Sequence, residues 1–97
     1  MKAQEILEAG FEFFGIDPKY IRNGRMTYTH GHQWNAILAI MYTCAEPKQS
    51  SAQLARLIKR DSSIIRRARK LLLCDSEVRD RALIFAKKLG FENKIIE

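Results

Sequence analysis

Apolar residues recur every three or four positions through most of this 97-residue chain, and that spacing predicts amphipathic helices. One stripe runs through residues 3–14 and ends at Gly15, a residue suited to the left-handed end of a helix. The most apolar segment, Gln33–Cys44, belongs in the middle of a bundle, and a last helix covers residues 76–89. Because no segment alternates with a period of two, the predicted fold class is all-α.

Between the first helix and the apolar segment, the sequence predicts a short helix and a loop. Asp17-Pro18 supplies an N-cap and a proline for the first helical position, so a helix is expected through Arg22. Residues 23–32 are mostly polar and include two glycines, which favours a loop. With the elements described below, the chain is predicted to form one bundle of about six helices over residues 1–97.

Residues 50–74 are predicted to form a helix-turn-helix. Ser50 and Gln53 have the spacing of a capping box, and Asp61 stands at the N-cap of the second helix. One face of that second helix is apolar and suits a core: Ile64, Ile65, Ala68, Leu71 and Leu72. The opposite face and its flanks offer hydroxyls and cations: Ser62, Ser63, Arg66, Lys70, Arg67 and Arg69.

Positive charge is concentrated in this unit. The chain has 17 Lys+Arg and 11 Asp+Glu, for a formal net charge of +6. Between residues 56 and 70 there are seven basic residues and one acidic residue, and elsewhere the charges cancel: Arg56, Lys59, Arg60, Arg66, Arg67, Arg69 and Lys70 against Asp61. A solvated face that only aids solubility is the alternative. The coincidence of cations, a capped preceding helix and hydroxyls at the helix start favours nucleic-acid binding.

Length and composition exclude several classes of protein. A chain of 97 residues can bury one modest core but has no room for a second, catalytic domain. The longest apolar run is too short to span a bilayer, and the start of the chain lacks a signal-peptide pattern. We therefore expect a cytoplasmic, nucleoid-associated protein without a membrane partner. Cys44 and Cys74 show no CxxC spacing; they could meet in space, but buried free thiols are expected in a reducing cytosol.

No motif for catalysis or for a cofactor is found. His30 and His32 lack a third ligand at a recognisable spacing, so no metal is expected. There is no phosphate-binding loop, and hence no nucleotide cofactor is expected. No nucleophile–base pair or paired carboxylates in an apolar setting are present, which argues against an enzyme.

Three segments, in order, resemble the C-terminal DNA-binding domain of the bacterial replication initiator DnaA. ILEAGFEFFGIDPKYI (Ile6–Ile21) is similar to the family's opening helix, its aromatic-Gly-Ile break and the short helix after it. AIMY (Ala39–Tyr42) resembles the Ala-Met-Tyr-Leu stretch of the central helix. SSAQLARLIKRDSSIIRRA (Ser50–Ala68) resembles the family's Ser-Leu-x-Glu-Ile-Gly helix and its Arg-Asp-His-Thr-Thr-Val signature.

The resemblance implies binding of double-stranded DNA, with the second helix of the unit in the major groove. Asp61 matches the signature aspartate, Ser62 its histidine, and Ser63 and Ile64 its two threonines. Serine and isoleucine differ chemically from the residues that they replace, so this chain should not be assumed to read the family's own DNA sequence. About three residues are inserted in 23–35, where the family has a basic loop, and Arg25 is the best candidate for its minor-groove contact.

The expected contacts divide into two sets by chemistry. Hydroxyls, a carboxylate and the guanidinium that suits guanine would face base edges: Asp61, Ser62, Ser63 and Arg66. The other cations would neutralise phosphates: Arg56, Lys59, Arg60, Arg67, Arg69 and Lys70. Arg22 and Arg25 are either ordinary surface charges or loop and minor-groove contacts.

The sequence thus predicts a stand-alone DNA reader without an ATPase, acting in replication or transcription control. The alternative is an adaptor that binds replication-initiation proteins through the same domain.

Overall fold

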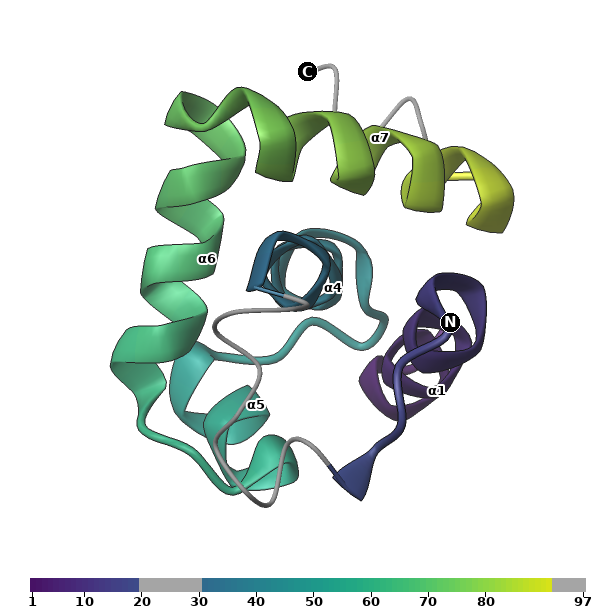
Figure 1. The fold of residues 1–97 in the computed structure, drawn as a ribbon. Helices are drawn as coiled ribbons and strands as arrows, with labels where there is room; N and C mark the ends of the chain where they lie inside the picture. The colour runs from purple at the N-terminus through teal and green to yellow at the C-terminus, as the bar shows by residue number, and fades with distance from the viewer. Residues whose placement is uncertain (20–30, 92–97) are drawn as a thin grey trace.

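Five α-helices account for most of the chain described by the computed structural model, which covers residues 1–19 and 31–91 (Figure 1). They are α1 (Ala3–Phe14), α4 (Gly31–Cys44), α5 (Ser51–Ile58), α6 (Ser62–Cys74) and α7 (Ser76–Leu89). These described residues contain no strand, so the all-α prediction is confirmed. The predicted helix through Arg22 runs into residues 20–30, outside the described part of the chain.

The first residues of α4 correct one prediction. The loop was expected to extend through His32, whereas α4 begins at Gly31. The helix thus begins two residues earlier than the apolar pattern indicates, because polar residues at the start of a helix do not contribute to that pattern.

Helix α4 lies at the centre of the fold. Figure 1 shows it end-on, with α1, α5, α6 and α7 around it, and all four of these helices contact it. Every residue of its middle stretch is fully buried: Ala36, Ile37, Leu38, Ala39, Ile40 and Met41. This middle stretch has no solvent face, which explains why its sequence is apolar all round.

Local signals set the other helix ends. Gly15 after α1 and Gly90 after α7 both adopt left-handed backbone conformations, with φ of 66° and 83°. Asp75 separates α6 from α7, and its Oδ1 accepts hydrogen bonds from the backbone N–H groups of Glu77 (2.9 Å) and Val78 (3.2 Å). These bonds satisfy the first turn of α7 and set the sharp corner between the two helices seen in Figure 1.

The prediction that both cysteines are buried is correct for Cys44 and wrong for Cys74. Cys44 is buried at the end of α4, but Cys74 is exposed. The buried residues of α6 are Ile65, Ala68 and Leu72. Cys74 is two positions beyond Leu72, about 200° further round the helix, and so it lies on the solvent side.

Candidate nucleic-acid interface

Helix α5 is held at its start by a reciprocal pair of hydrogen bonds. The hydroxyl of Ser50 accepts from the backbone N–H of Gln53 at 3.2 Å, and the Gln53 Oε1 accepts from the backbone N–H of Ser50 at 2.9 Å. The predicted capping box is therefore confirmed. On the inner side of this short helix, Leu54, Ala55 and Ile58 are buried, which leaves Arg56 exposed on the outer side.

The turn from α5 to α6 is made by Lys59 in a left-handed conformation with φ of 57°. The backbone N–H of Arg60 donates to the carbonyl of Ala55 at 3.0 Å, and that of Lys59 donates to Arg56 at 3.3 Å. This is the Schellman arrangement, which normally has glycine at the position occupied here by Lys59. The turn therefore places a cation at the corner between the two helices.

Asp61 caps the start of α6. Its Oδ1 accepts a hydrogen bond from the backbone N–H of Ser63 at 2.8 Å. This backbone bond, with further help from the Ser63 hydroxyl and the positive charge of Arg66, holds the pKa of Asp61 below its ordinary value. The carboxylate is thus charged at neutral pH and held at the surface, next to the hydroxyls of the first turn.

Helix α6 has one buried face and one exposed face, as the sequence predicted. Ile65, Ala68 and Leu72 are buried, and Ile64 packs partly against the core. The other face is solvent-exposed, apart from Ser62, which is half-buried: Ser63, Arg66, Arg67, Arg69 and Lys70. In Figure 1, α6 forms one whole edge of the bundle. The structure therefore brings the predicted residues of α6 onto one outward-facing surface.

The exposed cations of this surface form no salt bridge with an acid among the described residues. Within residues 1–19 and 31–91, the salt bridges join Lys19 to Asp17 and His32 to Glu77. None joins an acid to the exposed cations of α5, the turn or α6: Arg56, Lys59, Arg66, Arg67, Arg69 and Lys70. We call these six residues the cationic surface. Arg60, which the sequence grouped with them, is only partly exposed.

Tyr42 contacts the cationic surface, which the sequence did not predict. The guanidinium of Arg69 lies over the Tyr42 ring, 5.8 Å from the ring centroid. Tyr42 is half-buried on α4, so the contact links the central helix to α6. The sequence identified Tyr42 only as part of a family-like stretch, because nothing local indicates which α6 residue it faces. Arg22 and Arg25, the predicted loop contacts, lie outside the described residues.

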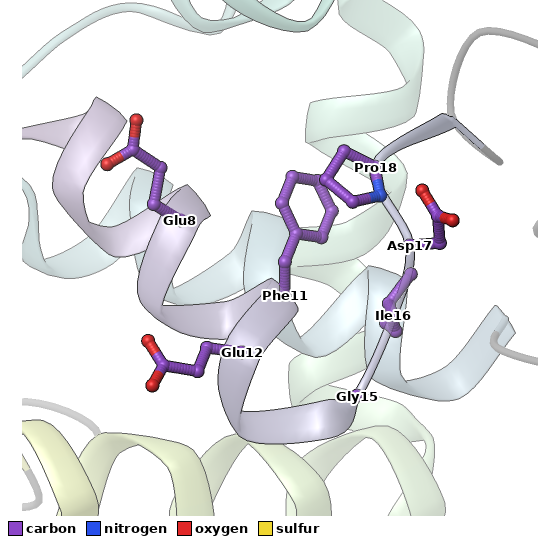
Figure 2. A pocket seen from close by; sticks show the side chains of 7 residues that line it. All are labelled: Glu8, Phe11, Glu12, Gly15, Ile16, Asp17 and Pro18. Carbon is purple, nitrogen blue, oxygen red and sulfur yellow. The ribbon is translucent and has the colours of Figure 1, made fainter.

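A hollow of about 550 Å³ lies beside α1. Its lining is partly acidic and partly apolar: Glu8, Phe11, Glu12, Gly15, Ile16, Asp17 and Pro18. Figure 2 shows the carboxylates of Glu8 and Glu12 directed away from the Phe11 ring rather than toward a common point. The side chains that line the hollow include no hydroxyl, thiol or imidazole, so it lacks a nucleophile of those kinds.

The described residues contain neither a metal-binding cluster nor a membrane-spanning helix. In residues 1–19 and 31–91, no three His, Cys, Asp or Glu side chains are grouped so that they could hold a metal ion. None of the helices found there has the length and apolar content that crossing a bilayer requires. Comparison with known proteins gave no match to a family model, a curated protein or a solved structure.

Proposed function

We propose that this protein binds double-stranded DNA through α5 and α6 acting as a helix-turn-helix, with α6 in the major groove. The observation that carries the proposal is the cationic surface, whose six residues are exposed and form no ion pair within the described chain. A charged face that only aided solubility would not need a capped helix before it or hydroxyls at its start.

The proposed DNA contacts are of two kinds: contacts with phosphates, which position the protein, and contacts with base edges, which read the sequence. Arg56, Lys59, Arg67 and Arg69 are suited to phosphates on either side of the groove, with Lys70 in either role. Near the start of α6, Ser63 and Arg66 are exposed and can reach base edges, and Arg66 can pair with guanine through two hydrogen bonds. Asp61 combines capping with a carboxylate that can accept from cytosine N4.

The resemblance to the DNA-reading domain of DnaA leads us to propose a role in replication or transcription control. The partial burial of Ile64 argues that this position, a threonine in the family, does not read bases here. We therefore propose a cognate DNA sequence different from that of the family. The proposed activity is binding alone, with no chemical step and no nucleotide.

Titration of labelled duplex DNA at rising salt concentrations tests the proposal. We compare the wild type with Arg66→Ala plus Arg67→Ala, and with Lys87→Ala plus Lys88→Ala as the matched control. The control removes the same charge from exposed positions in the last turn of α7. We expect steep salt dependence for the wild type and the control, and loss of binding for the α6 variant. Indifference to DNA at low salt would refute the proposal and favour the adaptor function.

Selection of bound sequences from a random duplex pool then measures specificity. A defined consensus is expected if Ser63 and Arg66 contact base edges. A two-fold symmetric consensus would indicate that two copies bind together, and an asymmetric one would indicate a single copy.

A further inference from the structure

A second hollow of about 550 Å³ lies between the start of α1, the segment after α4 and α5. Five of the side chains that line it carry cationic or amide groups: Lys2, Gln4, Gln49, Gln53 and Arg56. The remaining lining residues are apolar, and none is acidic. Such a set of donors, with no carboxylate among them, suits an anion.

The walls of the hollow are joined by backbone contacts. The backbone N–H of Glu46 donates to the carbonyl of Met1 at 2.8 Å, which fixes the start of α1 against the segment that leads into α5. The backbone N–H of Lys2 donates to the Glu5 carboxylate at 2.8 Å, which further holds the first residues of α1. The hollow is therefore formed by ordered backbone on both sides.

Gln53 is held in an orientation that leaves its amide nitrogen available. Its Oε1 accepts from the backbone N–H of Ser50 at 2.9 Å, so the carbonyl side of the amide is occupied by the capping box. The NH₂ group is a donor only, and no described side chain accepts from it. Gln4 uses its amide group to donate to Glu8 at 2.9 Å, with a second N–H remaining.

We infer that this hollow binds one backbone phosphate of the duplex, outside the stretch that α6 contacts. Arg56 belongs both to the hollow and to the cationic surface, so the two are continuous. Lys2 adds a further cation, and Gln53 adds a neutral donor, both from positions that the sequence did not associate with DNA. The inference rests on the proposed function, and it extends the DNA interface from α5 to the start of α1.

Two substitutions test the hollow while leaving the fold intact. Gln53→Glu preserves the capping box, because a glutamate at this position accepts the same Ser50 N–H. It removes the amide donor and places a negative charge at the phosphate. Lys2→Gln removes the cation at an exposed position. Lys88→Gln is the control: it also removes one positive charge, but from the last turn of α7, which does not line the hollow.

We measure duplex affinity against salt concentration, and also with single phosphates replaced by neutral methylphosphonates. Lys2→Gln is expected to reduce the slope of log K against log salt by about 0.9, and Gln53→Glu to weaken binding about tenfold or more with unchanged helix content. At one position, replacing the phosphate by a methylphosphonate should weaken duplex binding by the wild type but not by Lys2→Gln. If the wild type binds duplex DNA and both variants match Lys88→Gln, the inference is overturned. If the wild type fails to bind DNA at all, the proposed function itself fails.

Discussion

Gly10 of α1 lies so close to Ile37 of α4 that a Cβ atom on the glycine would be 2.6 Å from Cγ1 of the isoleucine. The same atom would be 2.8 Å from the isoleucine Cδ1. Both residues are buried, and the β-branched Ile37 has few alternative rotamers in a helix. The glycine is therefore needed for the close approach of the two helices, despite its cost in the middle of a helix.

Gly10→Ala is expected to destabilise the protein by up to about 2 kcal/mol. Alanine gains about 1 kcal/mol in helix propensity, but overpacking a close contact costs about 1–3 kcal/mol. The close atoms of Ile37 include Cγ1 and Cγ2 as well as the terminal Cδ1, so rotating the end of the side chain does not make room. We therefore expect the packing cost to exceed the gain. Urea denaturation of both proteins measures the difference.

The matched control is the same change in an Ile37→Ala background, where the obstructing atoms are absent. There Gly10→Ala should stabilise, because only the propensity gain remains. A destabilisation of equal size in both backgrounds would show that the contact with Ile37 is not the cause.

Apart from the start of α4, the helix boundaries were predictable because the signals that set them are local. The capping box of Ser50 and Gln53, the N-cap at Asp61 and the glycine after α1 are each recognised within four residues of sequence. The capping box and the N-cap form the hydrogen bonds that their residue types suggest, and Gly15 adopts the left-handed conformation that glycine allows. The faces of α6 followed from periodicity for the same reason.

Contacts between helices were not predictable in this way. The exposure of Cys74, the stacking of Arg69 on Tyr42 and the approach of Gly10 to Ile37 depend on which helix faces meet. The hollow beside Gln53 combines residues from the start of the chain with residues of α5, some 50 positions away. Periodicity assigns a residue to a face of its own helix but does not name the partner of that face.

The stability of α6 is expected to depend on pH through Asp61. Its pKa is lowered in the folded protein, mainly by the hydrogen bond from the Ser63 backbone N–H. A group with a depressed folded pKa stabilises the fold above its unfolded pKa, and this stabilisation is lost as the pH falls through the folded pKa. The loss is therefore expected below about pH 4.

The measurement compares urea unfolding of the wild type and Asp61→Asn over a range of pH. Asparagine still caps a helix but does not titrate, and the other acids cancel in the difference. The wild type should lose stability relative to Asp61→Asn only in the acidic range. A difference that is constant at all pH values would show that the carboxylate is not held by the cap.

Lys59→Gly is expected to stabilise the protein by about 0.5–1 kcal/mol, because glycine adopts the left-handed conformation of this turn without steric cost. Lys59→Gln, which loses the charge but keeps a β-carbon, is the control and should not stabilise. Under the proposed function, both variants should reduce the salt slope of DNA binding by the same amount, about 0.9. Thermal unfolding and DNA titration on the same samples separate the backbone effect from the charge effect. A gain in stability for Lys59→Gln equal to that for glycine would show that charge repulsion, rather than backbone strain, is relieved.

The contact between Arg69 and Tyr42 is expected to contribute about 0.5–1 kcal/mol to stability, the usual range for a cation over an aromatic ring near the surface. A double-mutant cycle with Tyr42→Leu and Arg69→Gln isolates this coupling from the packing of each side chain. Tyr42→Phe is the control, because it keeps the ring face over which the guanidinium lies, and the coupling to Arg69 should survive in it. Under the proposed function, Tyr42 would position the guanidinium of Arg69 for DNA, so the cycle repeated on DNA affinity should show weaker binding for Tyr42→Leu only when Arg69 is present. Equal effects of Tyr42→Leu with and without Arg69 would show that the two side chains act independently.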